Sequence, residues 1–150
     1  MNEQAVTDST CLIGWERIGR LDLLPALFIA VLEPPEVDRE LGRRFAWLKI
    51  QKPQDSPQLQ QWKALVDDGE AEAIALAQET GYQLILDDLQ ARALARRFGI
   101  RIIGTVGLLV RAKQAGIIPL LKPVMNQLKA GGFFIGIALE QEALRLVGEL

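Results

Sequence analysis

The chain has 150 residues, of which 49% are apolar and 24% are charged, and its formal net charge is −2. This length and apolar content suffice for one core, so we expect a single domain over residues 1–150. The slightly negative charge argues against strong nonspecific binding of nucleic acid, because counterion release requires a basic face.

The strongest compositional limit is the absence of histidine, together with the single cysteine Cys11. Without histidine the chain has neither an imidazole-ligated metal site nor the usual general base of serine and cysteine hydrolases. One cysteine cannot form an internal disulfide or a cysteine-rich zinc site, and we expect Cys11 to be a buried apolar residue. No run of 18 apolar residues and no secretory signal pattern occur, so we predict a cytoplasmic protein without a membrane span.

Hydrophobic periodicity and the positions of glycine and proline predict an alternation of strands and helices. The predicted strands cover residues 4–7, 29–32, 47–50, 84–86 and 101–103. The predicted helices cover residues 9–18, 21–27, 34–42, 57–66, 68–81, 89–98, 106–114, 119–129 and 137–147. This alternation is typical of a three-layer α/β/α fold with a mostly parallel central sheet. In the helix over 89–98 we expect an inward face made of Leu89, Ala93, Leu94 and Phe98.

Acidic residues lie where predicted strands end. Asp8 follows the first strand, and Asp87 and Asp88 follow the strand over 84–86. Ligands of open parallel sheets bind beyond the carboxyl ends of the strands, so these side chains could reach one crevice. The alternative for each is a helix N-cap, which an aspartate between a strand and a helix commonly provides.

Two glutamates on predicted helices are further candidates. Glu70 lies in the first turn of the helix over 68–81, where a negative charge also suits the helix dipole. Glu72 is two residues away, on a different face, and should not serve the same site. Glu40 lies late in the helix over 34–42, and its alternative is a solvated ion pair with a nearby arginine: Arg39, Arg43 or Arg44.

Carboxylates gathered without histidine indicate a hard divalent cation, Mg²⁺ or Mn²⁺, which prefers oxygen ligands. We predict a shared metal site whose ligands are Asp8, Glu70, Asp87 and Asp88. The chemistry that such a site favours is metal-assisted hydrolysis of phosphodiesters.

Three segments of the chain resemble the PIN domains: DSTCLIGWERIGRLDLLPALF, GEAEAIALA and LILDDLQARALARRFGIRIIGTVGLLVRAKQAGIIP. The PIN domains are metal-dependent nucleases that include the VapC-like toxins of toxin–antitoxin pairs. The chain is most similar to a PIN-like subfamily described as predicted nucleic-acid-binding proteins, over nearly its whole length. The resemblance implies that the catalytic acids are Asp8, Glu40, Glu70 and Asp88. It also implies that Asp87 assists them and that Ser9 or Thr10 orients Asp8 or a metal-bound water.

The first hypothesis is therefore an endoribonuclease toxin that uses Mg²⁺ or Mn²⁺, cleaves RNA, binds a small antitoxin protein and forms a homodimer. Arg92 and Arg96, four residues apart, could contact RNA phosphates, although an exposed charged face is an equal alternative. The five phenylalanines, three tryptophans and one tyrosine give little evidence for base stacking.

The second hypothesis is a PIN-like binding module with weak or absent catalysis. In that case the apolar segment GGFFIGIALEQEALRLVGEL could present a surface to a partner or to a second copy. Core packing is the favoured role of Phe133, Phe134 and the leucines that follow. A Rossmann-like nucleotide binder is disfavoured, because no glycine-rich phosphate motif follows the first strand.

Overall fold

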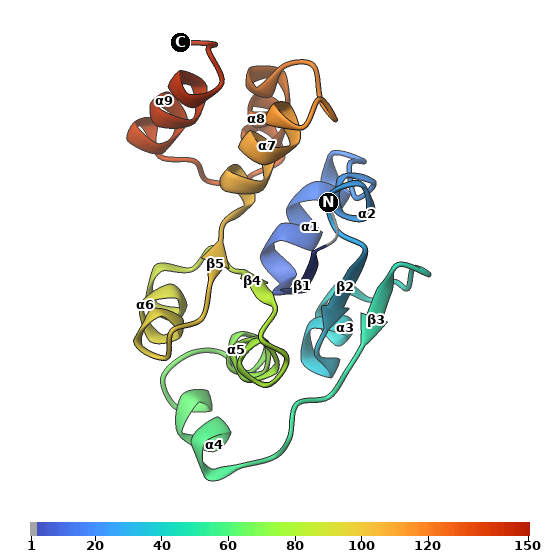
Figure 1. The fold of residues 1–150 in the computed structure, drawn as a ribbon, viewed down its shortest axis with the longest axis vertical. Helices are drawn as coiled ribbons and strands as arrows, with labels where there is room; N and C mark the ends of the chain where they lie inside the picture. The colour runs from blue at the N-terminus through green and yellow to red at the C-terminus, as the bar shows by residue number, and fades with distance from the viewer. Residues whose placement is uncertain (1–2) are drawn as a thin grey trace.

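The central sheet is built from five parallel strands (Figure 1). The computed structural model describes residues 3–150. Within that range the strands are β1 (Gln4–Thr7), β2 (Ala30–Glu33), β3 (Leu48–Ile50), β4 (Gln83–Ile85) and β5 (Ile102–Ile103). Their spatial order is β3-β2-β1-β4-β5, and each neighbouring pair is parallel. The predicted parallel sheet is confirmed.

Helices connect the strands and cover both faces of the sheet. They are α1 (Ser9–Arg17), α2 (Leu23–Leu27), α3 (Pro35–Leu41), α4 (Pro57–Lys63), α5 (Asp68–Thr80), α6 (Leu89–Arg97), α7 (Thr105–Gln114), α8 (Leu121–Ala130) and α9 (Ile137–Leu146). Gly42 and Gly81 end α3 and α5 with φ of 71° and 74°, a left-handed conformation that glycine adopts without a steric penalty. Across residues 3–150, no helix combines the length and the apolar character that crossing a bilayer requires.

Alternation of side chains along the strands creates two cores. Ala5 and Ile85 face one side and pack with residues of α1, α2, α7 and α8, while Val6 and Leu84 face the other and pack with α4, α5 and α6. Helices on both faces confirm the predicted three-layer α/β/α fold. Cys11 is 1% exposed in the first core, as predicted for an apolar residue.

The inward face that we predicted for α6 is partly wrong. Leu89 is 81% exposed and Ala93 is also exposed, whereas the helix buries Ala91, Leu94 and Ala95. Leu89 is the first residue of α6 and lines an open cavity, so its side chain stays in contact with solvent. Phe98, the last residue of the predicted face, is 39% exposed, so only Leu94 of the four predicted residues is buried.

The apolar C-terminal segment packs only in part. Ile135, Ala143 and Leu144 are buried, but Phe134 and Ile137 are 87% and 77% exposed. Core packing was the favoured prediction for this segment, and it is wrong for these exposed residues. The contacts of α9 with α7 and α8 use one side of the helix and leave the other side free.

Glu149 ties the end of the chain to the start of α8. Its carboxylate accepts hydrogen bonds from the backbone N–H groups of Leu121 and Lys122 at 2.7 and 3.1 Å, and Lys113 Nζ lies 3.1 Å away. Burial alone would raise the pKa of Glu149, but these donors outweigh it and lower the pKa. The side chain of the N-cap residue, Leu120, cannot cap α8, so Glu149 supplies the cap from a distance.

We expect Glu149→Ala to lower the free energy of unfolding by about 1 kcal/mol, because α8 loses its capping acceptor. Urea unfolding followed by circular dichroism would measure the change. Glu142→Ala is the matched control, since Glu142 pairs only with the exposed Arg145 on its own helix and should have a much smaller effect. Equal losses in the two variants would contradict the capping role.

Candidate active site

The carboxyl ends of β1 and β4 form the topological switch point of the sheet. From β1 the chain continues to β2 and β3 on one side, and the later strands β4 and β5 lie on the other. The N–H of Asp8 donates to the carbonyl of Ile85 at 3.1 Å, which ties the two strand ends together. Asp87 and Asp88 follow within three residues of that carbonyl. The fold thus brings these acids to one edge, where ligands of parallel sheets bind.

Asp8 is almost completely buried, at 3% exposure. It occupies the N-cap position of α1, yet its side chain makes no capping hydrogen bond, so the capping alternative is wrong for this residue. Its pKa is raised to about 7, mainly by desolvation, and the backbone N–H of Ser9 offsets only part of that rise. The negative charges of Asp67, Glu40 and Asp87 contribute to the raised value. Asp8 is therefore a buried acidic group on which the charges of other acids act.

Glu40 reaches the same region from α3. Ser9 Oγ donates to Glu40 Oε2 at 2.8 Å, so the hydroxyl after Asp8 orients Glu40 rather than Asp8 itself. Gly69 makes room for this carboxylate, because a Cβ at position 69 would lie 2.6 Å from Glu40 Oε1. The ion-pair alternative for Glu40 is wrong: the three nearby arginines bind other acids, in the pairs Arg39–Glu36, Arg43–Glu16 and Arg44–Asp38.

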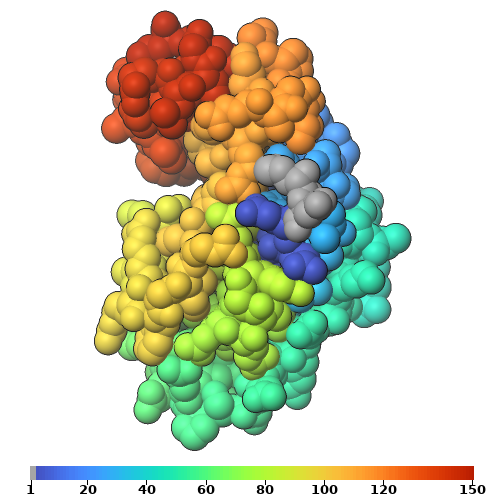
Figure 2. All heavy atoms as spheres, in the orientation of Figure 1, coloured from blue at the N-terminus to red at the C-terminus, as the bar shows by residue number. Residues whose placement is uncertain are grey.

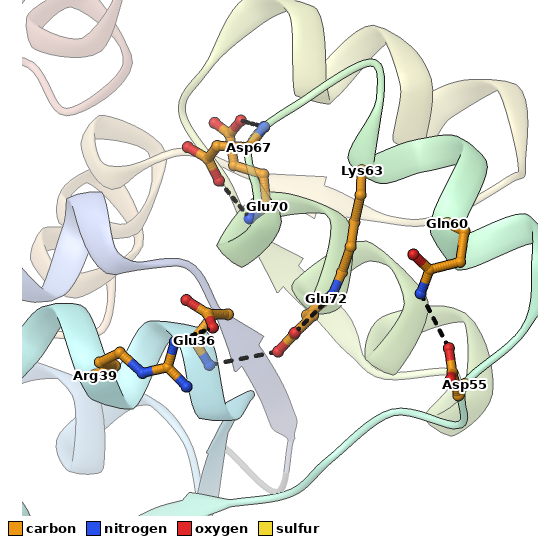
Figure 3. Close-up of polar contacts among 8 residues, drawn as sticks. All are labelled: Glu36, Arg39, Asp55, Gln60, Lys63, Asp67, Glu70 and Glu72. Carbon is orange, nitrogen blue, oxygen red and sulfur yellow. Dashed lines mark hydrogen bonds and ion pairs between the residues drawn. The ribbon is translucent and has the colours of Figure 1, made fainter.

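Glu70 and Asp67 form a capping box at the start of α5 (Figure 3). The N–H of Glu70 donates to Asp67 Oδ1 at 2.7 Å, and the N–H of Asp67 donates to Glu70 Oε1 at 3.2 Å. Desolvation raises the pKa of Glu70 to about 8, and the charges of Asp67, Asp8 and Asp88 add to the rise. The carboxylate of Glu70 therefore caps its helix and also belongs to the acidic group.

Glu72 lies on another face of α5, as its spacing predicts. Its carboxylate accepts from Lys63 Nζ at 3.2 Å and from the N–H of Glu36 at 3.4 Å (Figure 3). A charged partner and a backbone donor thus already satisfy Glu72. Its role is to join α5 to α3 and α4.

Asp87 and Asp88 have different partners. Asp87 accepts from the N–H and the Oγ1 of Thr105 at 2.8 and 2.6 Å, which fixes its carboxylate against the start of α7. Asp88 Oδ2 accepts from the N–H of Ala91 at 2.9 Å, so the capping alternative is correct for Asp88. Gly104 allows the approach of Asp87, because a Cβ there would lie 3.0 Å from Asp87 Oδ1.

Most of these acidic side chains line a cavity of about 960 Å³. Its acidic lining consists of Asp67, Glu70, Asp87 and Asp88, and its remaining wall comes from α1, α6 and the segment from Leu128 to Leu139. Figure 2 shows the hollow as a notch between the red α9 and the yellow α6. An elongated, negatively charged site is therefore open to solvent on one side of the molecule.

Of the polar residues that we predicted to assist the acids or to contact RNA, some line this cavity and others do not. Thr10 and Arg92 line it, whereas Arg96 is exposed on α6 and is not part of the wall. Arg92 Nη1 donates to the carbonyl of Leu86 at 3.4 Å, and its Nε is buried without a hydrogen-bond partner among residues 3–150. The guanidinium of Arg92 is thus held at the edge of the acidic group with donor capacity to spare.

The side chains of the site that could bind a metal are carboxylates, whose oxygen atoms suit a hard divalent cation. Within residues 3–150, no three acidic or cysteine side chains converge closely enough to hold a metal as they now lie. The carboxylates nevertheless lie in one region, and their negative charges help to raise the pKa of Asp8 and of Glu70. Mg²⁺ keeps several waters and takes only one or two carboxylates directly, so it does not require three convergent ligands. Asp8, Glu70, Asp87 and Asp88 would hold such an ion, directly or through its waters.

Two residues of the site were missed in the sequence. Asp67 lines the cavity and acts on the charge of Asp8, and its signal was the D-x-x-E spacing to Glu70, which is typical of a capping box. Thr105 anchors Asp87 from 18 residues further along the chain. Its only signal was its place just after the last predicted strand, at the edge where the acids gather.

A family model described as a PIN domain matches residues 4–149. The chain belongs to the PIN domain family. This family has a nuclease-type fold, and its members typically use divalent metal ions. A search of curated proteins gave no match to this PIN domain. The matched residues include β1, β4 and every acidic residue of the site.

Proposed function

We propose that this PIN domain is an endoribonuclease that uses Mg²⁺ or Mn²⁺ to hydrolyse RNA phosphodiester bonds. The observation that supports it most is the buried carboxyl of Asp8 at the switch point of the sheet, surrounded by further acids. Burying a carboxylate without a partner is costly, and here several acids gather at the sheet edge where ligands of parallel sheets bind.

The acids would divide the work among them. Asp8, Glu40, Glu70 and Asp88 are the proposed catalytic residues, and Asp87 joins Asp8, Glu70 and Asp88 as a proposed metal ligand. A bound divalent ion supplies a water of lowered pKa and stabilises the leaving oxygen. Ser9 holds Glu40 toward Asp8, and Thr105 holds Asp87 in one orientation.

The cationic groups of the site would bind the RNA backbone. Arg92 is placed to contact a phosphate, because it lines the cavity beside the acids. Thr10 lines the same wall and could donate its hydroxyl to the substrate. Arg96 remains a weaker proposal, supported by its place one turn after Arg92 on α6.

The experiment incubates a mixed pool of RNA with Mn²⁺ and the wild-type protein, the Asp8→Asn variant or the Asp88→Asn variant. We expect cleavage by the wild type and a rate at least about a hundredfold lower for Asp8→Asn, because a metal ligand is lost. Glu72→Gln is the matched control, since Glu72 faces away from the cavity, and it should retain cleavage. Cleavage that survives both site substitutions would come from another protein and would contradict the proposal.

We also propose that the enzyme is the toxin of a toxin–antitoxin pair, with a small antitoxin as partner and a homodimer as its assembly. The exposed Leu146 and Leu150, 52% and 76% exposed near the chain end, support a contact with another chain. A small open reading frame beside the gene, whose product blocks RNA cleavage, is the expected finding.

The alternative is a PIN-like module that binds a partner or nucleic acid with weak or no catalysis. The observation that favours it is the engagement of three acids in helix caps, at Asp67, Glu70 and Asp88. Calorimetric titration with Mn²⁺ separates the two: heat that disappears in Asp8→Asn supports the enzyme, and no heat in the wild type supports the module.

A further inference from the structure

The cavity beside the acids has an apolar side that catalysis of phosphodiester hydrolysis does not use. Four large apolar residues line it while exposed to solvent: Leu89 by 81%, Phe134 by 87%, Ile137 by 77% and Leu139 by 53%. Contiguous exposed apolar surface on a soluble protein usually marks a binding site. The same cavity therefore offers carboxylates at one part of its wall and apolar groups at another.

The chain places Phe134 in this wall through the turn that ends α8. Gly132 has a φ of 96°, and the N–H of Phe133 donates to the carbonyl of Leu128 at 2.9 Å. The ring of Phe133 packs on α1, where a Cβ at Gly14 would lie 2.9 Å from Phe133 Cδ2. Phe133 is thus anchored in the protein, and the neighbouring Phe134 is left open to the cavity.

Two guanidinium groups border the same space. Arg17 Nη1 donates to the carbonyl of Gly131 at 3.4 Å, beside the turn that carries Phe134, and Arg92 lies at the acidic part. Phosphates are bound by arginine and by cations, and unpaired bases stack on aromatic rings. The guanidinium groups, and a cation held by the acids, could bind the phosphates of a single-stranded nucleotide. The exposed ring of Phe134 could stack on its base.

We propose that Phe134 is the stacking platform for an unpaired nucleobase of the RNA next to the bond that is cleaved. This inference rests on the proposed nuclease function and adds a base subsite to it. An apolar segment of a partner protein fits less well, because it would cover four carboxylates without compensating their charge. An RNA strand brings cation-bridged phosphates to those carboxylates and lays its base on the ring.

The test measures binding of labelled single-stranded RNA by fluorescence anisotropy in the otherwise wild-type protein, the parent, with Ca²⁺ in place of Mn²⁺, so that a cation still bridges phosphates and carboxylates while cleavage is slowed. Phe134→Ala should weaken binding roughly tenfold or more, because base–aromatic stacking is lost. Phe134→Trp should restore the affinity, and Phe134→Leu should not, since it is apolar without a ring system. Ile29→Ala is the matched control: Ile29 is 60% exposed but does not line the cavity, and its truncation should leave RNA binding unchanged.

A set of RNAs with one abasic position each locates the base. At one position the abasic RNA should bind the parent and the Phe134→Ala variant equally, because no base remains to stack. Unchanged affinity of Phe134→Ala for intact RNA would overturn the proposal, and so would a failure of the parent to bind RNA at all.

Mn²⁺ calorimetry with Phe134→Ala in the otherwise wild-type protein separates this inference from the proposed function. Unchanged Mn²⁺ binding with weakened RNA binding supports both. Mn²⁺ binding without any effect of Phe134 on RNA overturns the base subsite alone. An effect of Phe134 on RNA in a protein that binds no Mn²⁺ supports the subsite and contradicts the catalytic function.

Discussion

Metal-free protein is expected to lose stability as the pH rises from about 4 to about 7, and Asp8→Asn should remove a large part of that loss. The pKa of Asp8 is about 7 in the folded protein, well above its ordinary value of 3.8. Between those values the folded state holds a proton that the unfolded chain has released. The free energy of unfolding therefore falls with rising pH through this window.

The replacement of Asp8 by a neutral amide avoids the cost of burying its charge. At pH 8 the metal-free Asp8→Asn variant should exceed the wild type in stability by about 2–4 kcal/mol, which is the order of magnitude of a shift of this size. Urea unfolding in the presence of a chelator, at pH 5 and at pH 8, measures both proteins. A variant less stable than the wild type at pH 8 would contradict this account of Asp8.

Glu33 provides the control for this pH dependence. It is buried at the end of β2, its Oε1 has no hydrogen-bond partner within residues 3–150, and desolvation raises its pKa to about 7. Glu33→Gln should also reduce the loss of stability at high pH. The charges that act on Glu33 are those of Asp38 and Arg44, whereas those that act on Asp8 belong to the acidic group of the site. Glu33→Gln should therefore leave Mn²⁺ binding intact, and Asp8→Asn should abolish it.

Mn²⁺ should raise the melting temperature of the wild-type protein at pH 8, because the cation binds only the folded acids. At a concentration a hundredfold above the dissociation constant the gain is about 2.7 kcal/mol, or roughly 5–10 °C for a domain of this size. Differential scanning fluorimetry measures the shift.

The shift should vanish in Asp8→Asn and persist in Glu72→Gln, whose carboxylate is already paired with Lys63 on another face of α5. Equal shifts in the wild type and in Asp8→Asn would place the bound Mn²⁺ elsewhere on the protein. A loss of the shift in Glu72→Gln would show that the two faces of α5 do not act independently.

The helices and strands could be predicted from short sequence patterns, but their arrangement in the sheet could not. Glycines at positions such as 42 and 81 mark helix ends, and short apolar runs such as 84–86 mark strands, so the elements followed from the sequence. The order β3-β2-β1-β4-β5 did not follow, because it depends on which strands pair across long distances in the chain. The switch point could be located only once that order was known.

Some residues of the candidate site could be chosen from the sequence, but Asp67 and Thr105 could not, and neither could the contacts of any of them. Asp8, Glu70 and Asp87 could be chosen from their places at strand ends and in a first turn. Whether an acid caps a helix or remains uncompensated depends on backbone geometry, and the structure separates Asp88, which caps, from Asp8, which does not. Thr105 could not be identified as the anchor of Asp87 from the sequence. Their contact depends on the pairing of β4 with β5, which brings the start of α7 beside the end of β4.

The most direct measurement is the anomalous scattering of Mn²⁺ in crystals of the wild-type protein soaked with the metal. The account predicts a peak at the carboxyl ends of β1 and β4, with Asp8 among its ligands and Glu70 or Asp87 bound directly or through water. A peak elsewhere on the protein, or well-ordered acids with no peak between them at saturating Mn²⁺, would contradict it.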